Sequence, residues 1–259
     1  MRSLNKGIIL FILLFVSLAI LLRMEVMQES NRAGILLTFD DHSIDDWLAA
    51  QPLFDKYNAK ATYFVNFLGD LSDEELAGVQ SLYSKGNEIG SHGWKHLSAT
   101  NYLKNHSIDE YIQEEIVPTI EKLKELGIEP KSFSYPYGVS AKGLDQALFH
   151  YFRTIRGTAY LRPGQSIKEL DKIYYDLHQP HSLIYAIGLD ESYGYSDEDI
   201  MEALQYAVDT ERIVMFYGHR IDLTNQGVEG CTRGDRLEKI LQFAKDHNMS
   251  YYTAEELNR

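Results

Sequence analysis

The feature that most constrains the fold is a regular alternation of short apolar runs with helical patterns along most of the chain. We predict strands at residues 34–39, 60–67, 87–91, 132–135, 152–158, 183–189 and 212–217, with residues 251–253 as a further candidate. We predict helices at residues 43–57, 72–85, 108–126, 141–151, 196–209 and 233–248. Strands that alternate with helices indicate a parallel sheet. Seven or eight such strands are the number expected of a closed or nearly closed barrel.

Polar, titratable side chains follow several of these predicted strands. In a parallel barrel, residues at the carboxyl ends of the strands converge on one face. We therefore expect one common site that contains Asp40, Asp41, His92, His96, Tyr137, Asp190 and His219. Clustered titratable groups are typical of catalytic and metal-binding sites. The pattern favours a metal site over a set of unrelated surface residues.

Residues 91–96 carry two histidines four positions apart. In one turn of helix, His92 and His96 would lie on the same face and share one metal ion. Such a site normally needs a third protein ligand, usually a carboxylate, and an open position for water. In metalloproteases with this spacing a Glu follows the first histidine, whereas Gly93 stands there in this chain. The catalytic base is therefore expected elsewhere.

Length and composition indicate one large domain with its own core. The 259 residues are 44% hydrophobic and 24% charged. The formal charge of -13, with no cluster of Lys and Arg, argues against nucleic acid as a partner and favours a neutral or cationic substrate. Cys231 is the only cysteine, which excludes an intrachain disulfide, a zinc ribbon and a redox pair.

The N-terminus carries a targeting segment. Residues 7–22 contain no charge, and Arg2, Lys6 and Arg23 flank them. We predict that residues 1–23 are an uncleaved membrane anchor with the basic end in the cytoplasm, and that the catalytic part lies outside. A cleaved signal segment and a secreted protein are the alternative. Residues 24–33 are then a linker, and residues 34–259 are the catalytic domain.

With these residues assembled, the sequence resembles the polysaccharide deacetylase family, which shares the NodB homology domain and is also called carbohydrate esterase family 4. The resemblance spans about residues 34–257. Its four matching motifs, in the family's order, are Thr38-Phe39-Asp40-Asp41, Ser91-His92 through His96, Phe133-Ser134-Tyr135-Pro136-Tyr137-Gly138 and Met215-Phe216-Tyr217-Gly218-His219. The first two motifs together are highly specific. The resemblance implies an α/β fold, a distorted (β/α) barrel of about seven strands.

The resemblance also implies a reaction and a metal. Asp41, His92 and His96 are the implied ligands of one divalent metal ion, for which zinc is expected, although such ligands also admit cobalt, nickel or iron. The implied reaction is removal of acetyl groups from an N-acetylated glycan polymer. Two other classes of function remain open: a noncatalytic glycan-binding protein that keeps the barrel, and a metal-dependent amidase acting on a small non-sugar amide.

Three further residues receive roles in amide hydrolysis. Asp40 is the implied general base, and His219 is the implied general acid that protonates the leaving amine. The backbone N–H of Tyr137, beyond the turn at Pro136, is expected to stabilise the oxyanion. Trp94, inside the second motif, is the most plausible aromatic platform for a sugar ring.

The sequence departs from the family's pattern at three positions. Ser134 stands where an Arg often orients the base, His42 stands where a Gly commonly follows the two aspartates, and Asp190 as the fourth motif lacks an accompanying Trp. Strand alternation puts Arg153 and Arg156 on opposite faces of the predicted strand 152–158. We predict that Arg156, nearer the carboxyl end, supplies the missing cation beside Asp40.

Overall fold

The computed structural model describes residue 15 and residues 33–141, 143–177, 179–181 and 183–258. The predicted anchor and linker therefore lie, except for residues 15 and 33, outside the described part of the chain. Residues 33–259 form a compact unit distinct from residues 1–32. Within the described ranges, none of the helices has the length and apolar character needed to cross a membrane.

Seven parallel strands close into a barrel, as the strand count and the resemblance predicted. The ring runs through β1 (Gly34–Asp41), β2 (Thr62–Val65), β3 (Glu88–Ser91), β4 (Ser132–Ser134), β5 (Thr154–Thr158), β7 (Leu183–Gly188) and β8 (Ile213–Gly218). Strand β8 pairs with β1 from Gly34 to Phe39 and so closes the ring. The observed α/β barrel confirms the predicted fold class.

Strand β1 has two different neighbours along its other edge. Its carboxyl half, from Thr38 to Asp41, pairs with β2, and its first three residues pair with β11 (Ser250–Tyr252). The candidate strand at residues 251–253 therefore exists, but it lies outside the ring. At Gly34 an added Cβ would lie 2.4 Å from the ring of Tyr252, so this approach of β11 needs glycine.

The remaining strands are short and were not predicted. Strand β6 (Tyr174–Tyr175) runs antiparallel to β8, and β9 (Arg220–Asp222) pairs with β10 (Cys231–Arg233) in a separate two-stranded sheet. Two or three residues are too few to show the alternation by which a strand is recognised.

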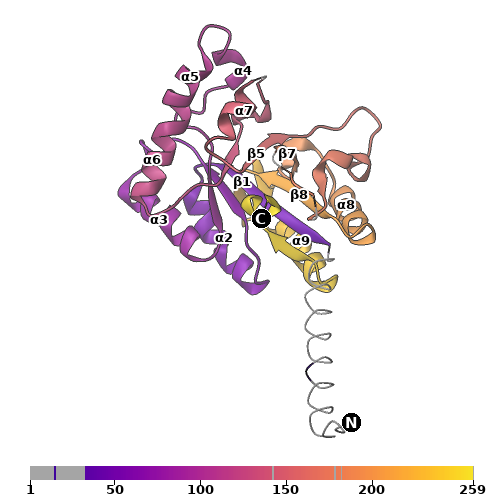
Figure 1. Ribbon diagram of the computed structural model, residues 1–259. Helices are drawn as coiled ribbons and strands as arrows, with labels where there is room; N and C mark the ends of the chain where they lie inside the picture. The colour runs from indigo at the N-terminus through magenta and orange to yellow at the C-terminus, as the bar shows by residue number, and fades with distance from the viewer. Residues whose placement is uncertain (1–14, 16–32, 142, 178, 182, 259) are drawn as a thin grey trace, which may run out of the picture. The chain divides into compact units, whose positions relative to one another are not determined.

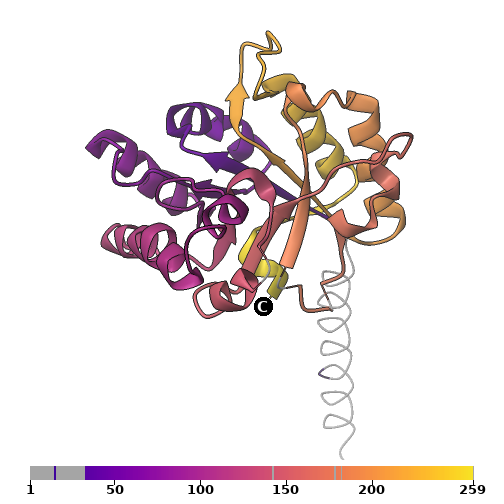
Figure 2. The ribbon, with the colours of Figure 1, turned by 90° about the horizontal axis from the view of Figure 1, so that it is seen from above.

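Helices lie on both sides of the strands (Figures 1 and 2). The longer ones are α2 (Ile44–Lys56), α3 (Asp73–Ser84), α6 (Val117–Glu125), α8 (Asp197–Asp209) and α9 (Gly234–Asp246). Reciprocal side-chain and backbone hydrogen bonds at Ser72 and Glu75 start α3, and the same arrangement at Ser196 and Asp199 starts α8.

The predicted helix at residues 108–126 is continuous but not uniform. It consists of α5 (Ile108–Tyr111), a π-helical turn η1 (Ile112–Ile116) and α6. Pro118 lacks an N–H, and in a regular helix its ring would clash with the carbonyl of Glu114. The chain widens into the π turn just before this proline, which removes the conflict.

Other helices differ in extent from their prediction. The predicted helix at residues 141–151 is reduced to α7 (Leu144–Leu148) among the described residues, and α4 (Ala99–Tyr102) was not predicted. Short 3-10 turns follow several strands and close the chain: η2 (Pro136–Gly138), η3 (Ile167–Glu169), η4 (Asp171–Ile173), η5 (Glu191–Tyr193) and η6 (Ala254–Asn258). Single turns leave little periodic signal in a sequence.

The core has one part inside the barrel and one part between the barrel and the helices. Along β1, Leu36 belongs to the cluster inside the barrel, whereas Ile35, Leu37 and Phe39 belong to the cluster that contacts the helices. Alternation continues along the strand, so Asp40 faces the barrel interior. Burial on both faces explains why these strands read as unbroken apolar runs.

Candidate active site

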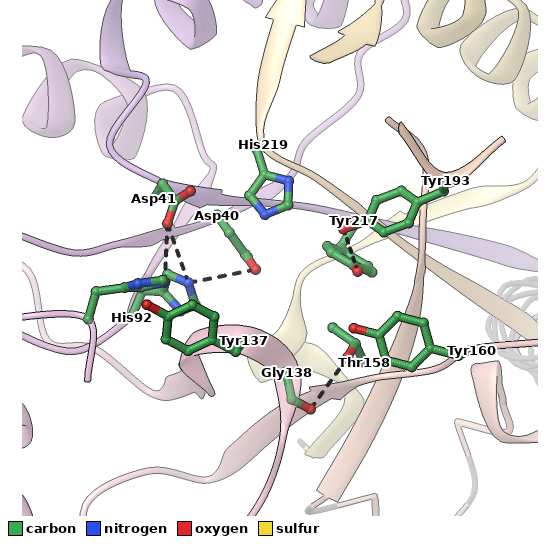
Figure 3. Close-up of a pocket in the computed structure, with 11 residues that line it drawn as sticks. Asp40, Asp41, His92, Tyr137, Gly138, Thr158, Tyr160, Tyr193, Tyr217 and His219 are labelled. Atoms are coloured by element: carbon green, nitrogen blue, oxygen red, sulfur yellow. Dashed lines mark hydrogen bonds and ion pairs between the residues drawn. The ribbon is translucent and has the colours of Figure 1, made fainter. Parts of the chain in front are cut away.

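A pocket of about 420 Å³ opens at the carboxyl ends of the strands (Figure 3). Its lining residues come from at least four strands and the turns after them: Asp40, Asp41, His92, His96, Tyr137, Gly138, Thr158, Tyr160, Tyr193, Tyr217 and His219. Six of the seven polar residues expected to converge line this pocket, and the seventh, Asp190, contacts His219.

Asp40 is buried at the floor of the pocket beside an arginine. The Nη2 atom of Arg156 donates hydrogen bonds to Oδ2 of Asp40 and to Oγ of Ser134. The Arg156 side chain is fully buried, whereas Arg153 is exposed. The cation thus comes from β5, next to the strand that carries Ser134. The structure thus places Arg156, the arginine nearer the carboxyl end of the predicted strand, beside Asp40.

The guanidinium of Arg156 is further held by aromatic rings. Its Cζ lies 4.9 Å from the ring centre of Tyr217 and 5.5 Å from that of Phe64. Such cation–π contacts stabilise a buried cation without using its hydrogen-bond donors. Within the described residues, the Oδ1 atom of Asp40 has no hydrogen-bond partner, so it is free to accept a proton or a hydrogen bond from a molecule in the pocket.

Asp41, His92 and His96 form a group that fits a metal ion. Their ligand atoms lie within 4.8 Å of one another. Oδ1 of Asp41 is 3.6 Å from Nε2 of His92 and 3.5 Å from Nε2 of His96. One carboxylate and two imidazoles are a donor set that divalent ions such as zinc accept.

The tautomer of His92 is set by a backbone contact. Nδ1 of His92 lies 2.9 Å from the carbonyl oxygen of Ser134, which can only accept, so this nitrogen carries the hydrogen and Nε2 offers its lone pair to the site. Burial lowers the pKa of His92 to about 3, and burial also lowers the pKa of His96. Neutral imidazoles are the forms that bind metal.

The two histidines converge without a helix. Residues 92–98 form no helix after β3, and the left-handed φ angles of Gly93 (82°) and His96 (56°) turn the chain. The two rings nevertheless lie 4.9 Å apart. The expected turn of helix is therefore wrong, because a strand end followed by two left-handed residues brings the rings together instead.

A short hydrogen-bonded chain orients Asp41. Nδ2 of Asn66 donates to Oδ1 of Asp41 at 2.9 Å, and Oδ1 of Asn66 contacts Nδ1 of His42 at 2.7 Å. His42, which replaces the common Gly, is exposed and turns toward Asn66. Sequence reasoning missed Asn66, although its place just after β2 is the signal that identified the other site residues.

Tyr137 stands at the rim of the pocket. Its φ of 61° is left-handed, and its side chain is 62% exposed, with its ring centre 4.7 Å from that of His96. The adjacent Gly138 also has a left-handed φ, and an added Cβ there would lie 2.0 Å from Oγ1 of Thr158. This close contact fixes the turn that presents the Tyr137 backbone to the pocket.

His219 lines the pocket on a different side from Tyr137 (Figure 3) and contacts Asp190. Its Nδ1 atom is 2.6 Å from Oδ2 of Asp190, whose other oxygen accepts from Oγ1 of Thr232 at 2.6 Å. Burial lowers the pKa of His219, but the hydrogen bond to Asp190 and the charge of Asp40 outweigh it and raise the pKa to about 9. His219 is therefore protonated at neutral pH.

Two residues that sequence reasoning missed support this pair. Thr232 was not predicted because it lies on the short strand β10. Trp47, on α2, donates from Nε1 to the carbonyl oxygen of His219 at 2.7 Å. No tryptophan lies near Asp190 in the sequence. Trp47 instead contacts His219, the histidine that Asp190 binds, from helix α2.

Trp94, His181 and Cys231 do not line the pocket. Trp94 packs against the outer core and fills the space beside Gly69, so it does not line the pocket as a sugar platform. Nε2 of His181 contacts the carbonyl oxygen of Asp176, and Cys231 is buried. His178 lies outside the described residues.

The polysaccharide deacetylase family model matches residues 28–150. This range includes Asp40, Asp41, both histidines of the second motif and Tyr137. Over these residues the chain is similar to the polysaccharide deacetylase family. His219 lies beyond the matched range, and a comparison with curated protein sequences finds no match.

Solved structures of polysaccharide deacetylases share the fold. The peptidoglycan deacetylase PdaC from Bacillus subtilis is 18% identical, with a TM-score of 0.56 over 88% of this chain and 91% of that chain. A family 4 acetyl xylan esterase from Clostridium thermocellum, in complex with a cobalt ion, is 22% identical, with a TM-score of 0.54 over 86% and 89%.

The family also contains proteins described as inactive. A family 4 pseudoenzyme from Bacillus anthracis is 13% identical to this chain, with a TM-score of 0.57 over 88% of this chain and 66% of that chain. Similarity to the polysaccharide deacetylase family and a barrel of this kind therefore do not by themselves establish turnover. Whether the protein is active depends on the side chains in the pocket.

Proposed function

We propose that this protein is an active, metal-dependent hydrolase of the polysaccharide deacetylase family that removes acetyl groups from an N-acetylated polysaccharide. One observation supports this proposal above the others: three kinds of group face the same pocket. They are the buried carboxylate of Asp40, which pairs with Arg156, the protonated imidazole of His219, and the possible metal ligands Asp41, His92 and His96. A base, an acid and a metal-ligand set in one pocket are what amide hydrolysis requires.

The residues divide the reaction between them. Asp41, His92 and His96 hold the divalent ion, for which we propose zinc. When bound, the ion would act as a Lewis acid, which activates water and polarises the acetyl carbonyl. Asp40 accepts the proton of the attacking water while Arg156 keeps its carboxylate oriented.

Two groups act on the other atoms of the amide. Tyr137 lies in a left-handed turn at the rim of the pocket, and its backbone N–H donates a hydrogen bond to the developing oxyanion. His219 gives its proton to the departing sugar nitrogen, and Asp190 stabilises the imidazolium form until that transfer.

The pocket also suits a sugar. Tyr137 and Tyr160 are large exposed aromatic side chains at its rim, and aromatic faces of this kind stack on sugar rings. The formal charge of -13 favours a neutral or cationic polymer. We further propose that residues 1–23 anchor the protein in the cytoplasmic membrane with the barrel on the outer side, where such polymers lie.

Acetate release tests the proposal. We expect the purified domain to release acetate from N-acetylglucosamine oligomers, to lose this activity with a chelator, and to regain it with added zinc. His92→Ala should leave the site without metal in elemental analysis. Oligomer binding without acetate release would instead indicate a noncatalytic glycan-binding protein, and hydrolysis of small amides alone would indicate an amidase on a non-sugar substrate.

A further inference from the structure

The loop that carries His96 needs an external support. It leaves β3 at Ser91 and contains the left-handed residues Gly93 and His96. A left-handed conformation is unfavourable for a non-glycine residue, so the surrounding structure must hold His96 in place. Helical hydrogen bonds, which would position the second histidine in a helical motif, are absent from this described loop.

A buried carboxylate provides that support. Oε1 of Glu115 accepts a hydrogen bond from the backbone N–H of Lys95 at 2.8 Å, and Oε2 accepts one from the backbone N–H of Leu97 at 3.1 Å. These two amides are the direct neighbours of His96 on either side. Glu115 itself is 0% exposed. Both side-chain oxygens of Glu115 are therefore used, and the two hydrogen bonds bracket His96.

Gly93 makes room for this carboxylate. An added Cβ at Gly93 would lie 2.3 Å from Oε2 of Glu115, so the loop wraps the carboxylate closely and needs glycine at this point. The glycine that follows the first histidine thus has a structural reason of its own. It leaves a space that a side chain from another element fills.

The π turn η1 directs Glu115 toward the loop. Within this turn Ile112, Glu115 and Ile116 are all buried, so a charged side chain shares the inner face with two apolar ones. Oγ1 of Thr119 donates to the Glu115 backbone carbonyl at 2.9 Å and gives this widened turn a further bond. Single π turns within helices are often found at functional sites.

We propose that Glu115 is a positioning residue that sets the place of His96 and thereby the affinity of the metal site. The inference rests on the proposed function, because it takes His96 as a metal ligand. Outer groups that orient metal ligands typically change metal affinity on the order of 10- to 100-fold when they are replaced. Glu115 acts here through two backbone amides rather than through the imidazole ring.

The test compares Glu115→Gln with Glu114→Gln. Glu114 is the adjacent residue and binds the side chains of Lys95 and Tyr102, not the loop backbone. The amide of the first variant can accept only one of the two N–H groups, so its affinity for zinc, measured by competition with a chromophoric chelator, should fall on the order of 10- to 100-fold. The affinity of E114Q should be unchanged. Wild-type affinity in E115Q overturns the proposal, even if its melting temperature is lower.

Hydrogen exchange in the metal-free protein gives a second measurement. The Lys95 and Leu97 amides should exchange faster in E115Q than in wild type and E114Q, and equal exchange in all three overturns the proposal. If wild type binds no zinc, the proposed function fails, whereas the exchange result still decides whether Glu115 holds the loop. If E115Q does not fold, Glu115→Asp, which withdraws the carboxylate by one methylene, should weaken zinc binding and release the same amides; wild-type values in that variant overturn the proposal.

Discussion

At the scale of single residues, the pairing of Asp40 with Arg156 shows how the chain compensates for Ser134. The family position expected to carry an arginine holds a small hydroxyl, and the cation arrives from the neighbouring strand to contact both residues. A buried ion pair of this kind is costly to break from one side, because the remaining charge stays in the interior.

Arg156→Ala should therefore destabilise the protein and slow the reaction. We expect the free energy of unfolding of the metal-free protein, measured in urea, to fall by about 3–5 kcal/mol. Arg153→Ala, an exposed arginine directly before the same strand, is the matched control and should change stability by less than about 0.5 kcal/mol. Equal effects of the two variants would contradict the assigned pairing.

Asp40→Asn should separate metal binding from turnover. The amide keeps the shape of the carboxylate but cannot take a proton from water, so kcat should fall on the order of 10² to 10⁴ fold. Elemental analysis should show the metal content of wild type, because the ligand set is Asp41, His92 and His96. A variant with near wild-type kcat would move the base role to another group.

Asp190→Asn should shift the pH dependence of the reaction. Asp190 is a main cause of the raised pKa of His219, which is about 9, so its removal lowers that pKa. The general acid must be protonated, and the rate therefore declines as pH rises through the His219 pKa. In the variant, this decline in kcat/KM should move to lower pH.

A second substrate serves as the control for the Asp190→Asn experiment. An activated aryl acetate has a leaving group that needs no proton, so its hydrolysis should show little of the alkaline decline in either protein. An unchanged alkaline limb in the variant with the glycan oligomer would remove His219 from the role of acid.

At the scale of elements, the turn η2 and strand β5 are fitted to each other at Gly138. Gly138→Ala adds a Cβ that would meet Thr158 at 2.0 Å in a left-handed conformation, whereas Gly164→Ala has a similar φ with open space around it. We expect Gly138→Ala to be less stable than Gly164→Ala by about 1–3 kcal/mol in urea unfolding and to lose activity as Tyr137 shifts. Equal stability would show that the turn relaxes freely.

At the scale of the whole molecule, the closed ring brings distant strand ends to one pocket. We propose that the N-terminal segment attaches the protein that carries this pocket to the membrane. We predict that the full-length protein is found in the membrane fraction and is extracted by detergent but not by high salt, because burial of apolar residues 7–22 is insensitive to screening. Deletion of residues 1–23 should leave a soluble, active domain. A shortened product found in the medium with a new N-terminus would instead show cleavage.

The sequence by itself determined the barrel and the membership of its pocket. Strand and helix periods are local properties, and parallel strands place their carboxyl ends on one face of the barrel. The sequence therefore predicts that Asp40, His92 and His219 share one site. The same local signals failed where an element was short, as in β10, or where a proline widened a helix, as in η1.

Only the tertiary structure decided how the site residues are held. Asp190 meets Thr232 across 42 positions of sequence, and Glu115 meets Leu97 across 18. Such contacts depend on the closure of the ring and on backbone angles such as the left-handed His96, which leave no periodic trace in the chain. The residues of the site can therefore be predicted from the sequence. The contacts that hold them in place depend on packing between elements that are far apart in the sequence.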